Sequence, residues 1–389
     1  MSRALAARAA PEISPVRIAT AGIGVVAVTF GMARYGYGLL LPDVRRTYGL
    51  GPGTLGLIGT GSYAGYLAAA FATGSLASRV GARATVVAAG LIAAAGMLLA
   101  GLARDPALFA AGIVIAGASA ALSFPPISDA AAALAPGVRG RVLSAVNCAT
   151  GYGVALAVPV AIAVGTQWRQ AWLAFAALAI LSAAWAAVAL PGRAPAASAP
   201  AYGWRSAICP RSAPLLAGGV LIGLGSSAYW TFSVAHLVDA GGLSSATSRT
   251  FLAVVGVAGL LATGTGDLVR AIGAPRAYAL LAATEAGGIA LLALAPASPA
   301  AAVASAIMFG GAYSAVVGVQ AIWSSEVYSE RPSLGLSALM AANGAGLMLG
   351  PVAAGAAAGA VGLEPVLLAG AAGVLASALL RPRHDILRA

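Results

Sequence analysis

Long apolar stretches separated by short polar segments run along the whole chain. A helix that rises about 1.5 Å per residue needs about 20 apolar residues to cross a hydrocarbon core of about 30 Å. Twelve stretches are of about this length or longer: residues 16–41, 54–76, 84–103, 107–133, 141–166, 170–190, 213–238, 250–270, 277–296, 300–325, 334–359 and 365–380. The pattern predicts an all-α membrane protein with 12 transmembrane helices.

The composition strengthens this prediction. Of the 389 residues, 60% are hydrophobic and 8% are charged, and the mean hydropathy is +0.91. A soluble domain carries about 25% charged residues, so we expect membrane lipid to surround most of this chain. The first stretch is longer than the 7–15 apolar residues typical of a signal peptide, and we expect it to form the first span.

The distribution of the basic residues along the chain predicts the orientation of the protein in the membrane. All 22 are Arg, and the net charge is +11. With a cytoplasmic N-terminus, 16 of the 22 fall in cytoplasmic segments, 5 in outer loops, and Arg34 inside the first span. This bias follows the positive-inside rule. It predicts both termini in the cytoplasm and anionic lipid, not nucleic acid, as the partner of the basic charge.

A short motif occurs twice. Residues 74–83, expected as the loop between spans 2 and 3, read GSLASRVGAR, and residues 266–276 read GDLVRAIGAPR. Gly81 and Gly273 are equivalent, 192 residues apart, which is about half of the chain. The repeat predicts two parallel six-helix bundles related by a pseudo-two-fold axis.

The expected organisation follows from this repeat. A cytoplasmic tail (1–15) precedes the N-terminal bundle (16–190), and a Pro- and Arg-rich cytoplasmic linker (191–212) leads to the C-terminal bundle (213–380) and a second cytoplasmic tail (381–389). Residues 43–53 are expected to form an outer loop.

The twelve spans, the repeat, the polar central segment and the Gly-x-Leu-x-x-Arg-x-Gly-x-Arg motif together resemble the major facilitator superfamily. The run Ala33-Arg34-Tyr35 followed by Leu40-Leu41-Pro42 is similar to its bacterial YbfB-like branch. The resemblance implies a central cavity between two bundles, solute transport by alternating access, and a bacterial plasma (inner) membrane location. Two features depart from the family: Ser78 replaces the usual acid, and the antiporter element of helix 5 is degraded before Pro159.

Arg34 is the first candidate binding residue. A permanent cation inside a spanning helix costs roughly 2.5–3.5 kcal/mol even on the mildest scale. In the functional interpretation, its guanidinium binds a carboxylate or phosphate of the solute, with Tyr37 on the same helical face. In the structural interpretation, Arg34 binds backbone carbonyls or an internal acid and holds the bundle together.

Three acidic residues are candidates for coupling or gating. Asp129, near the inner end of span 4, either titrates during transport or forms a latch with Arg79 or Arg83. Glu326 of span 10 has the same alternatives, with Arg270 or Arg276 as its partner. Glu285 falls in the middle of span 9, where a carboxyl should be neutral or paired. It forms either a structural hydrogen bond or a proton site.

Aromatic and polar residues in several spans suit a cavity for a partly apolar solute. The set comprises Tyr63, Tyr66, Tyr229, Trp230, Gln320 and Trp323. These residues face one another if the resemblance holds, although each alone is also typical of packing. His236 could titrate near neutral pH or serve as an ordinary packing residue.

The expected function is secondary active transport of a small organic solute, anionic because of Arg34. Protons are the expected coupling ion, with another ion gradient or the solute's own gradient as the alternatives. A drug or metabolite efflux antiporter is the alternative within transport, and a non-transporting membrane receptor is the alternative outside it. The chain has no Lys for a phosphate-binding loop and no His-Glu-x-x-His or Gly-x-Ser-x-Gly motif. We therefore expect a monomeric protein that is not an enzyme and has no cofactor or metal.

Overall fold

The computed structural model describes residues 14–192, 210–329 and 332–382. Within these residues it is all-helical, with twelve helical segments long and apolar enough to cross a membrane. The predicted number of spans is confirmed. Most of both predicted tails and the centre of the predicted linker lie outside the described residues.

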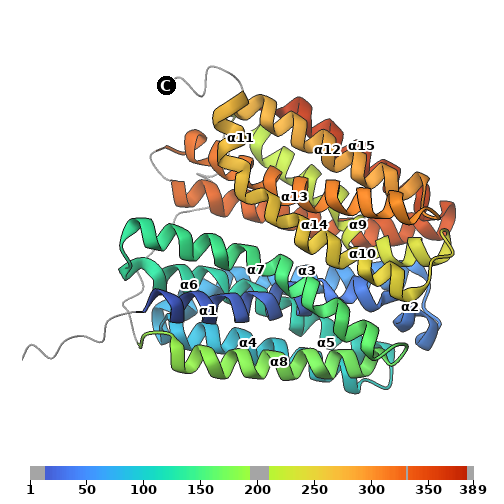
Figure 1. Cartoon of the computed structure of the whole chain (residues 1–389), viewed down its shortest axis with the longest axis horizontal. Helices are drawn as coiled ribbons and strands as arrows, with labels where there is room; N and C mark the ends of the chain where they lie inside the picture. Colours follow the sequence, from blue (N-terminus) through green and yellow to red (C-terminus); the bar gives the residue numbers. More distant parts are fainter. Residues whose placement is uncertain (1–13, 193–209, 330–331, 383–389) are drawn as a thin grey trace, which may run out of the picture.

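The first six spans form one bundle, drawn from blue to green in Figure 1. Its elements are α1 (Pro15–Val26), the π-helical η1 (Ala27–Arg34), α2 (Gly36–Tyr48), α3 (Pro52–Val80), α4 (Ala82–Leu102), α5 (Pro106–Ser119), η2 (Ala120–Leu122), α6 (Phe124–Ala130), η3 (Ala131–Ala133), α7 (Pro136–Ala163) and α8 (Trp168–Ala189). The first three elements make a single span of 34 residues, Pro15–Tyr48.

The last six spans form the second bundle, drawn from yellow to red in Figure 1. Its elements are α9 (Ala213–Asp239), α10 (Ser245–Ala258), η5 (Gly259–Gly264), α11 (Thr265–Ile272), α12 (Ala274–Leu294), α13 (Pro299–Val327), α14 (Pro332–Val361), α15 (Leu363–Ser377) and η6 (Ala378–Leu380). We call the end of the molecule that holds Pro15 and Leu380 the terminal end, and the end that holds Tyr48 and Asp239 the far end.

Two expected loops are wrong in their extent. The first helix continues through Asp43, Arg45 and Arg46 to Tyr48, and Gly49 ends it with a left-handed φ of 65°. These polar residues stay helical because they find charged partners, described below. Residues 74–80 are likewise helical, and Gly81 alone separates α3 from α4.

The repeated motif has the same backbone conformation in both bundles. Gly81 has φ 88° and ψ 161°, and Gly273 has φ 81° and ψ 152°. Positive φ at these values favours glycine, which explains why both copies carry it. Pro159 inside α7 and Pro351 inside α14 are a second pair with the 192-residue spacing.

The two bundles meet along three pairs of helices: α3 with α14, α7 with α10, and α2 with α9. Glycines permit the close approach. A Cβ atom on Gly56 would lie 2.9 Å from the carbonyl carbon of Pro351, and Gly151 of α7 packs directly against Gly256 of α10. Small residues of this kind let membrane helices pack backbone to backbone.

Candidate solute-binding site

The first span changes its helical type at its centre. Between α1 and α2, residues Ala27–Arg34 form a π-helix, and the Tyr35 amide donates to the Phe30 carbonyl oxygen, five residues earlier, at 3.3 Å. The backbone of this segment packs on Gly153 of α7. π-Helical turns are rare and are frequent at functional sites. This turn ends at Arg34 and sets the direction of its side chain.

Arg34 is enclosed by aromatic rings. Its guanidinium carbon lies 4.2 Å from the ring centre of Tyr66, 4.6 Å from Tyr63, 5.6 Å from Phe30 and 5.7 Å from Tyr35. The residue is 6% exposed, and its buried Nε has no hydrogen-bond partner. No carboxylate pairs with Arg34 in the described part of the chain. Ring faces attract a cation but carry no net charge, so they do not neutralise the guanidinium.

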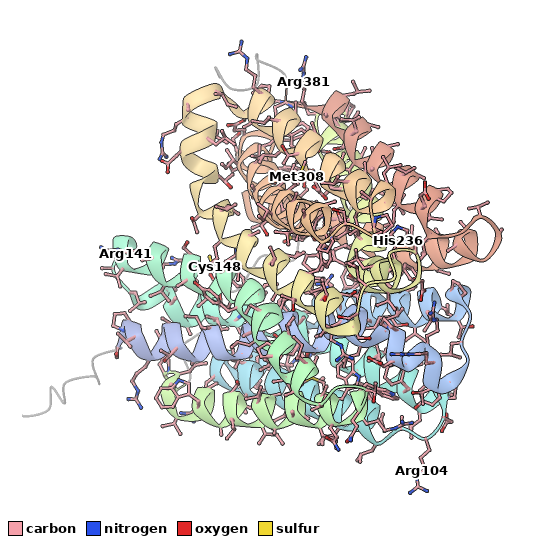
Figure 2. All side chains as sticks on the ribbon, turned by 45° about the vertical axis from the view of Figure 1, so that its right-hand side comes forward. Arg104, Arg141, Cys148, His236, Met308 and Arg381 are labelled. Atoms are coloured by element: carbon pink, nitrogen blue, oxygen red, sulfur yellow. The ribbon has the colours of Figure 1, made fainter. Side chains whose placement is uncertain are left out.

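A cavity of about 300 Å³ lies between the two bundles. Its walls come from α7, α10, η5 and α13, and they are lined by neutral side chains that include Ser144, Asn147, Cys148, Thr150, Thr263 and Ser314. Figure 2 shows Cys148 on the side of its bundle that faces the other bundle. The lining residues of α7, from Ser144 to Val154, lie in the middle third of that helix.

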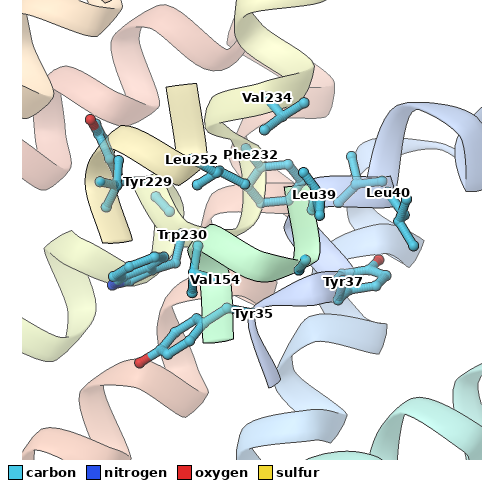
Figure 3. Packing of buried hydrophobic residues seen from close by; sticks show 14 of the residues in the cluster. Tyr35, Tyr37, Leu39, Leu40, Val154, Tyr229, Trp230, Phe232, Val234 and Leu252 are labelled. Atoms are coloured by element: carbon cyan, nitrogen blue, oxygen red, sulfur yellow. The ribbon is translucent and has the colours of Figure 1, made fainter. Parts of the chain in front are cut away.

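Aromatic rings from both bundles form the inner wall of this cavity. Tyr35 stacks on Trp230, with ring centres 4.2 Å apart, and Trp230 meets Tyr313 edge-on at 5.8 Å and 74°. In Figure 3, Tyr35 and Trp230 lie side by side. Tyr35 lines the cavity, and its ring also contacts the Arg34 guanidinium. The Tyr35 ring therefore lies between Arg34 and the cavity.

Tyr37, predicted to lie beside Arg34, is placed elsewhere. Its hydroxyl donates to the Leu55 carbonyl oxygen at 2.7 Å, and its ring packs against Phe109 of α5 at 6.2 Å. Figure 3 shows the Tyr37 ring well apart from Tyr35. The prediction assumed a regular α-helix, in which Arg34 and Tyr37 lie on the same face. The helix changes from π to α between Arg34 and Gly36, so the two side chains point in different directions.

The predicted residues of the second bundle divide into two groups. Trp230 lines the cavity, whereas the others lie inside their own bundle. There, the Tyr229 hydroxyl forms a hydrogen bond with Ser305 at 2.8 Å, and His236 Nε2 lies 3.2 Å from the Ala293 carbonyl oxygen. Two residues contact Tyr278: Gln320 Nε2 donates to its hydroxyl at 3.3 Å, and the Trp323 ring packs edge-on against its ring. These contacts are typical of packing.

Glu285 lies in the interior of the second bundle and is 0% exposed. One carboxyl oxygen, Oε1, lies 2.5 Å from the Ser226 hydroxyl of α9, and the other, Oε2, is buried without a hydrogen-bond partner. No described Arg or His forms an ion pair with it. The expected structural hydrogen bond is therefore present, and the proton-site alternative stays open.

The predicted latch residues lie at the terminal end. Asp129 and Glu326 are half-buried, and neither forms an ion pair within residues 14–192, 210–329 and 332–382. Their expected partners, Arg79, Arg83, Arg270 and Arg276, are all exposed. Arg270 pairs with Asp267 of its own helix. The latches stay predictions for a conformation in which this end is closed.

Two arginines at the far end join the bundles through charge, which the sequence analysis missed. Arg249 of α10 pairs with Asp43 of α2, and its Nη1 donates to the carbonyl oxygens of Ala161 and Gly165 at 2.7 and 2.9 Å. Arg249 and Asp43 are only 3% and 4% exposed. A half-exposed second pair joins Arg45 to Asp239, with contacts of 2.5 and 2.6 Å.

A family model described as the Major Facilitator Superfamily matches residues 23–332, well over half of the chain. The chain belongs to the major facilitator superfamily. It is therefore a transporter and not an enzyme. The YbfB-like branch stays a prediction, and a search of curated proteins gives no significant match.

Solved structures show the same fold. A variant of the nucleoside transporter NupG matches with a TM-score of 0.78 and 14% identity, over 93% of this chain and 98% of that chain. A bacterial homologue of the human lysosomal transporter Spinster, inward-facing and unoccupied, matches with a TM-score of 0.76 and 16% identity, over 94% and 96% of the two chains. At this identity the likeness concerns the fold alone.

Proposed function

We propose that this member of the superfamily is a secondary active transporter of a small organic anion, coupled to protons, in a bacterial inner membrane. The observation that carries the proposal is Arg34, a buried guanidinium without a carboxylate partner in the described chain, next to the aromatic wall of the cavity. An unneutralised charge at membrane depth is costly. An anionic solute removes that cost when it binds.

Alternating access needs a cavity that opens to one side at a time. The excess of Arg in the segments at the terminal end supports a cytoplasmic location for that end. The far end is bridged by Arg249 and Asp43. We therefore assign this conformation to the state that is open to the cytoplasm and closed to the outside.

The hydrogen bonds of the Ser226 hydroxyl support Glu285 as the proton carrier. The Ser226 hydroxyl lies 2.5 Å from both the Ile222 carbonyl oxygen and Glu285 Oε1. A hydroxyl has one proton to donate. When Ser226 donates to Ile222, its contact with Glu285 is a hydrogen bond only if the carboxyl supplies the proton. Ser226 is one helical turn from Trp230 on α9, so the proton site is connected to the cavity wall.

Ligand binding to the purified protein tests the anion site. An anion that binds the folded state stabilises it by mass action and so raises the melting temperature. At an anion concentration of 100 times Kd, the free energy of unfolding increases by about 2.7 kcal/mol. We expect shifts with a panel of organic anions such as acetate, benzoate and gluconate, and none with their neutral amides. Arg34→Gln should abolish the shifts, whereas the matched control Arg104→Gln, an exposed residue at the far end, should keep them.

Flux in proteoliposomes tests the transport cycle with the anion that gives the largest shift. Glu285→Gln should remove acceleration by an imposed pH gradient but keep exchange of labelled for unlabelled anion. Binding without any flux in the unaltered protein would instead support the receptor alternative. Anion shifts that persist in Arg34→Gln would remove Arg34 from the site.

A further inference from the structure

We propose that the solute is an aromatic monocarboxylate with one or two rings. This inference rests on the proposed transport of an organic anion and specifies its chemical class. It depends on three properties of the cavity: the rings in its wall, the number of charges beside it, and its size.

The inner wall of the cavity offers ring surfaces from both bundles. Tyr35, Trp230 and Tyr313 all line it. Trp230 and Tyr313 stand at 74°, and Tyr313 is backed by Phe309 in a parallel stack at 5.6 Å. Aromatic rings prefer offset-stacked and edge-to-face contacts. Because the Trp230 and Tyr313 rings are nearly perpendicular, a third flat ring placed between them can stack on one of them and meet the other edge-to-face.

The wall also holds a hydrogen-bond donor that lacks an acceptor. The indole nitrogen Nε1 of Trp230 is buried and unpartnered, as is Nε of Arg34. Buried donors without acceptors are costly. The two residues flank Tyr35, since Trp230 stacks on its ring and the Arg34 guanidinium lies 5.7 Å from its centre. Both nitrogens are closed off from the cavity in this conformation, so a ring carboxylate would supply acceptors for them when the Tyr35 ring between them moves aside.

The charge beside the cavity matches one negative charge. None of the residues that line the cavity carries a charged side chain, and Arg34 is the cation that contacts its ring wall. A phosphate monoester would bring a second charge to a site of low dielectric, where uncompensated charge is strongly disfavoured. A monocarboxylate is fully compensated.

The cavity volume of about 300 Å³ lies at the lower end of the range for small-molecule sites. The room at the inner wall is limited further by the bulk of Tyr35, Trp230 and Tyr313. The site therefore suits benzoate, phenylacetate or an indole carboxylate more than a larger conjugated drug.

Matched ligands separate the contribution of the ring from that of the charge. Calorimetric titration of the purified full chain would compare benzoate with cyclohexanecarboxylate, benzamide and phenyl phosphate. We expect benzoate to bind about threefold to tenfold more tightly than cyclohexanecarboxylate, since ring contacts add this much beyond buried area. Benzamide and phenyl phosphate should bind more weakly still.

Variants locate the ring contact. Trp230→Leu should remove the preference for benzoate over cyclohexanecarboxylate, and the conservative Trp230→Phe should restore part of it. Trp185→Leu on α8, which changes a 43% exposed tryptophan, is the matched control and should keep the preference. Tyr313→Leu gives a second test should Trp230→Leu fail to fold.

The outcomes distinguish this inference from the function on which it rests. Equal binding of benzoate and cyclohexanecarboxylate would overturn the aromatic class and leave the anion site intact. Tight binding of benzamide or phenyl phosphate would overturn the monocarboxylate assignment. Failure of every carboxylate to bind would overturn the proposed anion transport and, with it, this inference.

Discussion

The two bundles meet very differently at the two ends of the molecule. At the far end they are joined by a buried ion pair, by Arg249 bonds to two backbone carbonyls, and by glycine contacts. Toward the terminal end a cavity with neutral walls separates them, and the predicted latch acids Asp129 and Glu326 form no ion pair among the described residues. Within the part of the chain that the structure describes, the ion pairs that join the two bundles therefore lie at the far end.

The largest expected effect comes from breaking the buried pair. Asp43→Asn leaves Arg249 buried without its counter-charge, and loss of one partner of a buried ion pair costs roughly 3–5 kcal/mol. This cost falls on the conformation described here, so the terminal end should close. Maleimide labelling of Cys148, measured with Cys209→Ser to leave one thiol, should slow as the cavity closes.

The control uses a second arginine on the same carboxylate. Arg46 also pairs with Asp43 at 2.5 Å, but its side chain is 54% exposed. Exposed pairs contribute about 0–1 kcal/mol, so Arg46→Gln should leave the labelling rate nearly unchanged. Equal effects of Asp43→Asn and Arg46→Gln would contradict the role given to burial.

A smaller effect is expected from bulk at a glycine contact. Gly56→Leu places a side chain where Pro351 and Gly355 approach within 2.9 and 3.1 Å of a Cβ atom. Overpacking of this kind costs about 1–3 kcal/mol, and it should push α3 and α14 apart and slow Cys148 labelling. Gly74→Leu, on the same helix with nothing within 4 Å of its Cβ position, should have no such effect.

The half-exposed far-end pair should matter less. The side chains of Arg45 and Asp239 are 31% and 33% exposed, so Asp239→Asn is expected to cost up to about 1 kcal/mol. High salt should reproduce its small effect on Cys148 labelling because exposed charges are screened. A loss as large as that of Asp43→Asn would show that burial does not rank the two pairs.

The smallest effect, with the opposite sign, is expected at the terminal end. Asp129→Asn or Glu326→Gln removes a predicted latch that is not formed in this conformation. The free energy of unfolding should therefore change by no more than about 0.5 kcal/mol, which thermal denaturation measures. In the Asp43→Asn background the same changes should restore part of the Cys148 labelling. A further decrease in labelling would contradict the latch interpretation.

The sequence predicted the architecture because lipid imposes a simple rule on it. A run of about 20 apolar residues must form a helix in a bilayer, so all twelve spans were predictable. The 192-residue repeat was visible because Gly81 and Gly273 adopt a backbone conformation that glycine favours. The helix through Asp43 and Arg46 was missed because its polar residues resemble a loop until their partners are known.

The candidate site was only partly predictable. Tyr63 and Tyr66 lie together over Arg34 because they are three residues apart on one helical face. The sequence indicated them as cavity residues facing the second bundle, and it did not indicate their contact with Arg34. Tyr35 was missed because periodicity assumed 3.6 residues per turn, whereas the segment before it is π-helical. Arg249 carries no local signal, since its partner Asp43 lies in the other bundle, 206 residues away in sequence. Tyr313 was missed because its contact with Trp230 forms only when α9 and α13 pack together.

The place of Arg34 also ties the carrier to the membrane potential. About 21 Å of helix, at about 1.5 Å per residue, separates it from Tyr48 at the far end of the first span, so the guanidinium lies within the electric field. An elementary charge moved across the whole field is worth about 2.3 kcal/mol per 100 mV. A bound monoanion cancels the charge, so the loaded carrier should reorient without sensing voltage. In the proposed proton-coupled cycle, the empty carrier keeps the Arg34 charge, and an ionised Glu285 offsets it. The return of the empty carrier should therefore sense voltage only when Glu285 stays protonated.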